Sequence, residues 1–341
     1  MNAPDSPLPT ITLKSSAFRK EREHGWRELE RLLEQARRRG VTALAPADLE
    51  RLPLLYRAAL SSLSVARAIA LDRHLLLYLE DLSLRAYLVV YGPRAGLLEG
   101  CRDFLRRGFP AAVQAVRWHI LVALLALVAG TAAGFLLTVG DEAWFSAFVP
   151  VGLAGERGPS STRADLLNGE IFAPWPGFVD SFLVLANFLF QHNTMVGILS
   201  FSLGIAAGVP TLLLTLYQGL MFGAFIALHY DRGLAWQFMG WVTIHGVTEF
   251  GAVILSAAGG LLVAEKVLFP GRFSRLESLA RCSGTAARVA VGAMLMFFVA
   301  ALLEGGFRQL VQSTPLRLCI GLGVGALWLV YFCRPVRDPE P

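Results

Sequence analysis

Cysteine is scarce in this chain, and the four that occur lie far apart. There is no Cys-x-x-Cys pair and no other close pair. This spacing excludes a disulfide framework or a cysteine-rich zinc site as the basis of the fold, because both need cysteines in recurring pairs. The simplest interpretation is that each is an isolated small apolar side chain, and they are Cys101, Cys282, Cys319 and Cys333.

Known catalytic and nucleotide-binding motifs are also missing. The sequence has no Walker-type glycine-rich loop, which excludes ATP hydrolysis by that route, and no nucleophile elbow or Ser/His/Asp spacing. The segment from His245 to Glu249 is not the His-Glu-x-x-His helix of zinc proteases. Gly246 takes the place of the general base there, and Glu249 takes that of the second histidine. We therefore assign no catalytic residues, no metal ligands and no cofactor, and we expect no enzymatic activity.

Charged residues are few as well. They make up 17% of the chain, against 55% hydrophobic residues, and the mean hydropathy is +0.53. Such a composition is typical of an integral membrane protein. Residues 1–13 are rich in proline and have no apolar stretch of the kind found in a secretion signal. We expect residues 1–13 to be disordered and the first membrane helix to act as its own uncleaved signal.

The charges that are present are unevenly distributed. Residues 1–117 hold 19 Lys and Arg against 13 Asp and Glu, whereas the rest of the chain holds 12 against 13. A basic region beside a membrane is typical of the cytoplasmic side, where anionic lipids attract it. Nucleic acid is the other partner that a basic surface suggests, but no nucleic-acid-binding motif accompanies it. We therefore expect membrane lipids, and no nucleic acid, as partners.

The first third of the chain has the pattern of amphipathic helices. Apolar residues recur at three- to four-residue spacing over residues 18–33, with charges between them, as in a helix with one buried face. Pro46 opens a second helix, and Gly92 ends a third. This pattern predicts a cytoplasmic helical domain over residues 14–117, long enough to bury a core of its own.

The remainder is dominated by long apolar runs. The first run, residues 118–139, is a transmembrane helix, and residues 140–180 form an external loop. Residues 181–335 are a transmembrane bundle of an interfacial helix and five further spans, and residues 336–341 are a cytoplasmic tail. The predicted fold class is all-α: a polytopic membrane protein with about six transmembrane helices plus an N-terminal cytoplasmic helical bundle. We expect the interfacial helix at 178–191 and the spans at 196–209, 211–228, 241–264, 289–303 and 316–332.

The positions of the cations indicate the topology. Basic residues gather in residues 1–117, in residues 265–288 and in the C-terminal tail. Six crossings place all three segments in the cytoplasm, as the positive-inside rule requires. Five crossings would place residues 265–288 outside. We expect a multi-pass protein of the bacterial inner membrane with both termini cytoplasmic.

One apolar run carries two ionisable residues. Residues 241–264 include His245 and Glu249, which lie one helical turn apart and therefore on one face. A carboxylate in a membrane helix faces a protein interior or a wet cavity and has a partner there. Three interpretations stay open: a structural hydrogen-bonded pair, a polar seam for transport or lipid-headgroup binding, and metal ligation or catalysis. We expect Glu304 to pair with Arg308 at the interface instead. The seam is predicted to contain His245, Glu249, Asn193, Gln218 and Thr248.

Small residues recur along several of the apolar runs. Glycines spaced by four residues let two helix backbones approach closely. Packing within one chain and self-association as a homodimer both fit such faces. The residues predicted to form them are Gly204, Gly208, Gly219, Gly223, Gly246 and Gly251.

The sequence resembles a known family, the stage II sporulation protein M family. The resemblance runs from about residue 18 to residue 335 and depends on the order and spacing of its motifs. Glu80 departs from the family pattern, which has asparagine at that place. The motifs, in chain order, are Trp26, Tyr56, Leu79-Glu-Asp-Leu-Ser-Leu-Arg-Ala-Tyr87, Val90-Tyr91-Gly92, Asn193, Gln218-Gly219 and His245-Gly246-xx-Glu249.

The resemblance implies an integral membrane protein without a known reaction. The family's namesake anchors and localises partners in an assembly that remodels peptidoglycan. Many relatives are encoded beside a MoxR-type ATPase and von Willebrand-type proteins, which are therefore expected partners. We accordingly predict a non-enzymatic integral membrane scaffold at the bacterial inner membrane, active in cell-envelope remodelling and present as a homodimer.

Two other functions remain open from the sequence. The first is a transporter or lipid-handling protein that uses the seam of His245 and Glu249, because interrupted helices often line substrate sites. The second is an intramembrane metal-dependent hydrolase, for which His192, His229 and His245 with Glu249 would supply zinc ligands.

Overall fold

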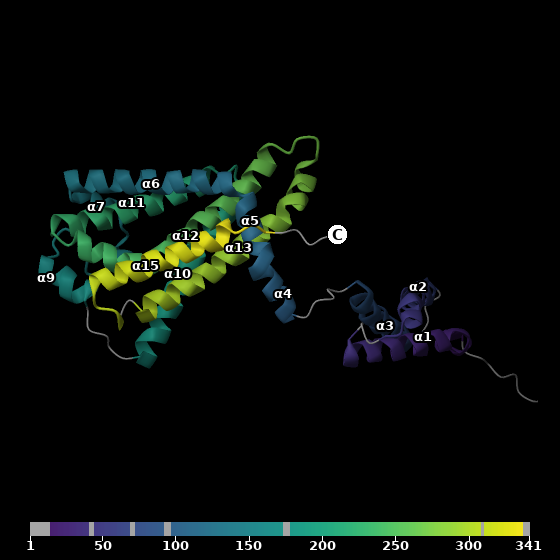
Figure 1. Cartoon of the computed structure of the whole chain (residues 1–341). Helices are drawn as coiled ribbons and strands as arrows, with labels where there is room; N and C mark the ends of the chain where they lie inside the picture. The colour runs from purple at the N-terminus through teal and green to yellow at the C-terminus, as the bar shows by residue number, and fades with distance from the viewer. Residues whose placement is uncertain are drawn as a thin grey trace, which may run out of the picture. The chain divides into compact units, whose positions relative to one another are not determined.

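The computed structural model of the chain describes residues 14–40, 44–68, 72–91, 97–172, 178–307 and 310–336 (Figure 1). It divides into two compact units, Met1–Gly100 and Cys101–Pro341. Every regular element among the described residues is a helix, which confirms the all-α fold class. Residues 1–13 and all but the first residue of the tail 336–341 lie outside the described part of the chain.

The N-terminal unit is a three-helix bundle. Its helices are α1 (Lys14–Arg39), α2 (Pro46–Ala68) and α3 (Arg73–Tyr91), and each packs against the other two. Pro46 suits the first turn of α2 because its missing N–H would have no helical partner there. Asp72 caps α3, since its carboxylate accepts a hydrogen bond from the backbone N–H of His74 at 3.1 Å.

The core of this bundle contains leucines, alanines and aromatic residues from all three helices. Trp26 lies within it, and its indole Nε1 donates to Ser62 Oγ at 3.2 Å, so the polar atom of the ring is satisfied inside the core. Glutamate and arginine side chains pair on the outer faces. The unit thus has the inside–outside contrast of a protein folded in water. Its fully buried leucines are Leu29, Leu32, Leu79 and Leu82.

The second unit is a bundle of long apolar helices. Five of its described helices are long and apolar enough to cross a membrane. The sixth expected crossing falls on α10 (Phe178–Ser202), part of whose side chains lie outside the described residues. The five are α6 (Arg117–Gly140), α11 (Val209–Asp231), α12 (Ala235–Leu268), α13 (Arg275–Leu302) and α15 (Thr314–Cys333).

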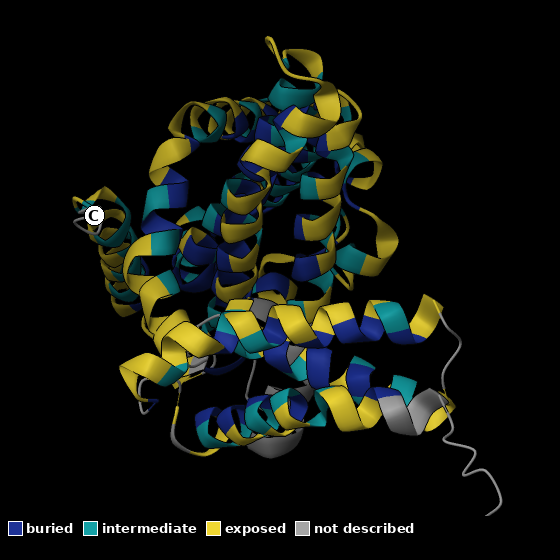
Figure 2. Cartoon of the chain, turned by 90° about the vertical axis from the view of Figure 1, so that its right-hand side faces the viewer, coloured by how far each residue is buried: buried dark blue, intermediate teal, exposed yellow. Residues whose placement is uncertain are grey.

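Helix α12 is the centre of this unit. It packs against α6, α10, α11, α13 and α15. Of its 18-residue apolar stretch, 67% is buried, compared with 22% for α6 and 11% for α15. Figure 2 colours the ribbon by burial, and in this unit the buried residues lie mainly on the helix faces turned toward other helices. The apolar residues exposed on α6 and α15 therefore form the surface available to lipid.

Glycines bring several of these helices into backbone contact. A Cβ on Gly219 would collide with Leu127 O, and one on Gly223 with Thr131 O, so α11 and α6 touch through these positions. Gly204 lies in the same way against the backbone of Gly260 on α12. Gly251 faces Met296 of α13, whereas Gly246 has only side chains of its own helix close to its missing Cβ.

The region around Pro210 differs from the expectation. The helix expected at 178–191 and the start of the span expected at 196–209 form the single helix α10. The helix does not break between residues 191 and 196, where a break was expected. It ends at Ser202, and a 3₁₀ turn (Leu203–Ile205) follows, with Gly208 beyond it at a positive φ of 75°. Pro210 lies in the first turn of α11, where proline is tolerated. Two consecutive residues, Ala207 and Gly208, have left-handed backbones before α11 begins, and at the second of them glycine carries no steric cost.

The first domain boundary is also earlier than expected. Residues 101–117 belong to the membrane unit and not to the helical domain predicted over 14–117. The reason is α5 (Phe109–Ala115), whose Phe109 is 2% exposed and packs edge-on to Phe332 at 5.2 Å. Gln114 Nε2 donates to Phe332 O at 2.7 Å, and Tyr331 OH donates to Leu105 O at 2.7 Å.

The segment predicted as an external loop over 140–180 contains helical turns. They are α7 (Ala143–Phe148), α8 (Val151–Ala154), α9 (Arg163–Leu166) and a π-helical turn (Leu167–Ile171). The side chains of Phe145, Leu166 and Ile171 are buried against α11 and α12 residues such as Leu228 and Phe238. This segment is therefore packed on the end of the bundle.

Candidate functional site

A cluster of ionisable side chains lies inside the membrane unit. His245 and Glu249 come from α12, four residues apart, so that both lie on one face. The third member, Glu304, lies in the π-helical turn Leu303–Phe307 that continues α13. Because α12 and α13 are consecutive helices packed together, the end of α13 returns to the first half of α12. We call these three residues the His–Glu–Glu cluster.

The three side chains are close together. His245 Nε2 lies 3.8 Å from Glu304 Oε1 and 4.0 Å from Glu249 Oε2. One ligand atom from each residue lies within 4.8 Å of those from the other two. His245 is 6% exposed and Glu304 is 7% exposed, while Glu249 is half-buried. The arrangement therefore places two carboxylates and one imidazole around a common point.

The burial of these groups has an electrostatic cost. Two ionised carboxylates so close together repel one another, and removal of each from water is unfavourable. Protonation lowers this cost, and so does a positive charge beside the carboxylates, such as a protonated imidazole or a bound cation. The cluster can thus hold a proton or a metal ion.

Two features fix the orientation of the cluster. The first is the π-helical turn, which inserts a residue into α13 and redirects the side chain of Glu304; such turns are frequent at functional sites. The second is Trp241, one turn before His245, whose ring meets the imidazole edge-on at 6.0 Å. The imidazole is thereby held between an aromatic ring and the two carboxylates.

The other residues predicted for the seam lie in different surroundings. Thr248 is fully buried, and its Oγ1 accepts a hydrogen bond from Trp328 Nε1 at 3.0 Å, which ties α12 to α15. Asn193 is buried on α10, and Gln218 is half-buried on α11. Neither has a hydrogen bond or ion pair to His245 or Glu249 among those that the structure describes.

Sequence reasoning missed Glu304. The pattern did not place Glu304 beside His245, where the structure buries it. The predicted ion pair of Glu304 with Arg308 stays a prediction, because Arg308 lies outside the described residues. The available signal was topological: two consecutive membrane helices run antiparallel, so a polar residue at the end of one can meet a polar residue near the start of the other.

A second polar group closes one end of the bundle. Arg232 Nη1 donates to Glu142 Oε1 at 2.8 Å and its Nη2 donates to Pro159 O at 2.6 Å. This hydrogen bond lowers the pKa of Glu142 below its usual value. Nearby, Arg317 is 1% exposed and its Nη1 donates to Ile171 O at 2.9 Å. These contacts are architectural, since they satisfy backbone carbonyls of the helical turns over residues 143–171.

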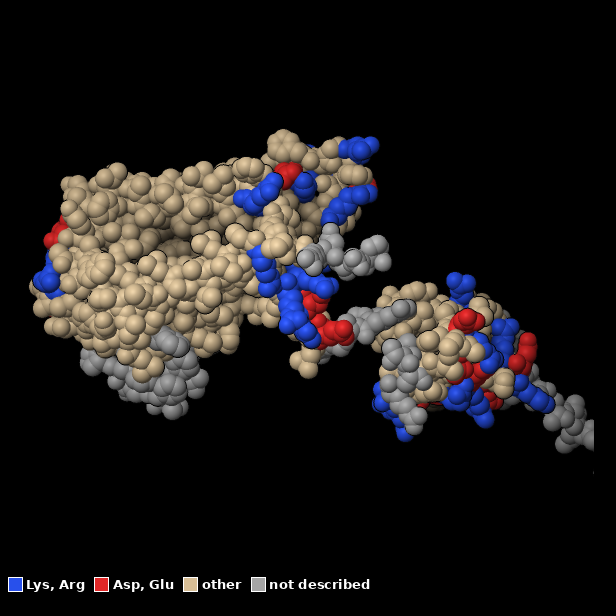
Figure 3. Space-filling model, in the orientation of Figure 1, with Lys and Arg blue, Asp and Glu red and all other residues tan. Residues whose placement is uncertain are grey.

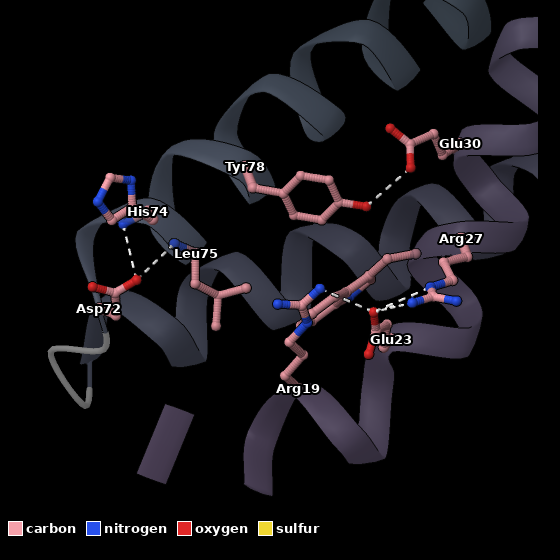
Figure 4. A pocket seen from close by; sticks show the side chains of 9 residues that line it. Arg19, Glu23, Arg27, Glu30, Asp72, His74, Leu75 and Tyr78 are labelled. Carbon is pink, nitrogen blue, oxygen red and sulfur yellow. Dashed lines mark hydrogen bonds and ion pairs between the residues drawn. The ribbon is translucent and has the colours of Figure 1, made fainter. Parts of the chain in front are cut away.

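The N-terminal unit has a polar cleft between α1 and α3 (Figure 4). Tyr78 OH donates to Glu30 Oε2 at 3.4 Å, and burial raises the pKa of the Tyr78 phenol. Arg19 and Arg27 both donate to Glu23 Oε1, at 3.1 and 2.7 Å. In this cleft, Glu23 is thus paired with two arginines, and Asp72 accepts hydrogen bonds from the backbone at the start of α3.

Basic side chains of the membrane unit gather mainly at one end (Figure 3). That end carries the loop between α12 and α13 and the helices α4 (Leu97–Asp103) and α5. On the face seen in Figure 3, the middle of the bundle shows almost no charge. His119 Nε2 lies 2.9 Å from Glu265 Oε2, which joins the start of α6 to the end of α12 there. The basic residues of this end include Arg102, Arg106, Arg107, Lys266, Arg272 and Arg281.

Comparison with known proteins divides the chain at nearly the same place as the structure. The profile of the family described as Stage II sporulation protein M matches residues 123–307, which is more than half of the chain and includes the whole His–Glu–Glu cluster. A domain of unknown function (DUF8413) matches residues 16–92. The match to the Stage II sporulation protein M family therefore covers less of the chain than the expected range of residues 18–335. Neither a curated protein nor a solved structure matches the chain.

Proposed function

Because the chain belongs to the Stage II sporulation protein M family, we propose that it is a non-enzymatic membrane scaffold that recruits a partner protein through its N-terminal unit. The membrane unit anchors the complex in the bacterial inner membrane. Partners in keeping with the family resemblance are a MoxR-type ATPase and von Willebrand-type proteins, and the role is in cell-envelope remodelling.

The observation that carries this proposal is an apolar stripe on α3. Leu77, Leu84, Leu88 and Tyr91 recur at helical spacing on one face, and each is between 51% and 60% exposed. We call these four residues the α3 stripe. Asp81 lies on the same face, one turn from both Leu77 and Leu84, and pairs with Arg85 at 2.8 Å. Exposed apolar side chains bordered by polar ones are typical of a protein-binding site.

The α3 stripe is additional to the core that the unit needs. The opposite face of α3 supplies Leu79, Leu82 and Ala86 to the core, and all three are fully buried. A helix with one buried face and a second apolar face has apolar area left over for a partner, as in helix–groove recognition. This surplus supports recruitment by the N-terminal unit.

A pull-down from detergent-solubilised membranes tests the proposal. The double variant Leu84→Asp/Leu88→Asp should lower the amount of co-purifying partner at least about tenfold, since buried apolar residues dominate interface energies. Leu98→Asp is the matched control, because Leu98 is 89% exposed on α4, outside the stripe. Equal recovery with both variants, or a wild-type chain that purifies alone, would refute recruitment through α3.

The structure also supports the proposed orientation. The residue Gln114, which precedes the first span in the sequence, contacts the end of the last span, because its Nε2 donates to Phe332 O. The first span therefore begins at the same end of the bundle at which the last span finishes, which requires an even number of crossings. Cys101 and Cys333 are both exposed, so in intact cells a membrane-impermeant maleimide should label neither until the inner membrane is permeabilised. Labelling of either one from outside would contradict cytoplasmic termini.

The second candidate is transport or lipid handling at the His–Glu–Glu cluster. The observation in its favour is the burial of His245 and Glu304 inside a bundle with a polar centre. Flux or lipid binding with Glu249→Gln decides this case, because unchanged behaviour in the variant removes its support.

The predicted glycine faces pack within one chain, so they give little support to a homodimer. Gly204 contacts the backbone of Gly260 of the same chain, and Gly219 and Gly223 contact the backbone of α6. A dimer, if formed, would therefore use another surface, and sedimentation of the detergent complex measures its stoichiometry.

A further inference from the structure

We propose that the His–Glu–Glu cluster binds one divalent transition-metal ion of the zinc class, which cross-links α12 to the end of α13. The inference does not depend on partner recruitment. It rests on the geometry of His245, Glu249 and Glu304 and on the chemistry of their ligand atoms.

The spacing of the three ligand atoms suits a single ion. A tetrahedral zinc ion holds nitrogen and oxygen ligands at about 2.0–2.2 Å and so keeps them roughly 3.3–3.6 Å apart. In the structure His245 Nε2 is 3.8 Å from Glu304 Oε1 and 4.0 Å from Glu249 Oε2, and the three ligand atoms lie within 4.8 Å of one another. Small rotations of the two flexible glutamate side chains complete the fit.

The donor types also point to this class of ion. One imidazole nitrogen and two carboxylate oxygens are a ligand set that zinc, manganese and ferrous iron accept, whereas magnesium prefers oxygen alone and retains water. Two carboxylates neutralise a dication, so the loaded site carries no net charge. Binding thus removes the repulsion between Glu249 and Glu304 inside the bundle.

The positions of the ligands place the ion between two helices. Glu304 is 7% exposed, and it reaches the cluster from a π-helical turn that ends α13. Trp241 holds the His245 ring edge-on from the preceding turn of α12. A metal ion there joins two helices that are consecutive in sequence and fixes the π-helical turn. Three protein ligands leave one coordination position for water.

The test uses the full chain in detergent, purified without a polyhistidine tag and freed of metal with a chelator. Calorimetric titration with Zn²⁺ and elemental analysis after dialysis give the affinity and the stoichiometry. The expected result is one zinc per chain and a rise in melting temperature on addition of Zn²⁺, with little response to Mg²⁺.

The variants separate the cluster from adventitious binding. Glu249→Gln, Glu304→Gln and His245→Ala should each weaken zinc binding at least about 100-fold, since loss of even an outer-shell partner commonly costs 10–100-fold. Glu142→Gln, outside the cluster, is the matched control and should retain wild-type affinity. Glu249→His keeps a ligand atom at the same place and should restore most of the affinity that Glu249→Gln loses.

Two results would overturn the proposal. One is full zinc stoichiometry in all three ligand variants, which would place the ion elsewhere. The other is no zinc uptake by the wild-type chain. If Glu249→Gln then also melts at a higher temperature than the wild type in metal-free buffer, a shared proton, and not a metal ion, occupies the cluster.

Discussion

The two units of this chain are both helical, but they distribute polar residues in opposite ways. In the N-terminal unit, charged residues cover the outer faces and the fully buried positions are occupied by residues such as Leu29 and Leu79. In the membrane unit, α6 and α15 expose leucine and valine, while His245 and Glu304 are buried at the centre. The solvent explains the difference, because water favours polar surfaces and lipid favours apolar ones.

The comparison extends to how the helices touch. In the N-terminal unit, side chains separate the backbones, and Gly25 has nothing within 4 Å of its missing Cβ. In the membrane unit, backbones touch at Gly204, Gly219 and Gly223. Lipid supplies no hydrophobic drive between helices, so close packing through small residues has to supply the attraction.

Substitution of glycine should give the largest contrast between the units. Gly223→Leu forces a side chain into the backbone of Thr131, and we expect the membrane unit to lose at least about 3 kcal/mol or to fail to fold. Gly25→Ala should instead stabilise α1 by about 0.5–1 kcal/mol, because alanine is the better helix former and the space is open. Thermal unfolding of the two variants in detergent, followed by circular dichroism, measures both. A Gly223→Leu chain as stable as the wild type would contradict the backbone contact.

Leucine truncation should also separate the two units. Leu79 is fully buried in the N-terminal core, so Leu79→Ala should cost about 2–5 kcal/mol of unfolding free energy. Leu327 is 70% exposed on α15 and faces the surface available to lipid. We expect Leu327→Ala to change stability by less than about 0.5 kcal/mol, as surface substitutions usually do. A large loss with Leu327→Ala would instead indicate a protein contact on that face of α15.

The smallest effect is expected at the ion pair of Glu142 and Arg232. The hydrogen bond from Arg232 lowers the pKa of Glu142 below its usual value of 4.5. A carboxyl whose pKa is lower in the folded state contributes stability above the unfolded pKa, and this contribution is lost as the pH falls through the folded pKa. The side chain of Glu142 is 42% exposed, so the pair contributes at most about 1 kcal/mol.

The matching experiment compares melting temperatures above and below this range. Between about pH 6 and about pH 3, well around the reference pKa of a glutamate, the wild-type chain should lose more stability than Glu142→Gln. Identical pH profiles for the two chains would show that the pair does not stabilise this end of the bundle.

The sequence was most informative where water surrounds the fold. Apolar spacing over residues 18–33 predicted α1, and Pro46 marked the start of α2, because an amphipathic helix in water has to alternate its faces. In the membrane unit nearly every residue is apolar, so periodicity does not tell which face of a helix is buried. The length of each apolar run predicts a membrane crossing, but it does not predict which helices contact one another.

The misses have the same physical origin. Glu304 was expected at the membrane interface because it ends an apolar run in the sequence. In the structure, the packing of α13 on α12 brings it to His245. Pro210 was expected to divide the two spans, but α10 ends at Ser202, and the left-handed residues Ala207 and Gly208 precede α11. The burial of Arg317 against Ile171 O depends on segments 146 residues apart. Each outcome depends on tertiary contacts that a local pattern does not contain.

The central claim is that the chain joins an independent, water-folded helical unit, whose α3 stripe is open to a partner, to a membrane anchor. Thermal unfolding of residues 1–100 alone, in buffer without detergent, tests it most directly. We predict a soluble, helical fragment with one cooperative transition, which Leu79→Ala lowers and Leu84→Asp leaves nearly unchanged. A fragment that is unfolded, or that needs detergent to remain soluble, would contradict the account.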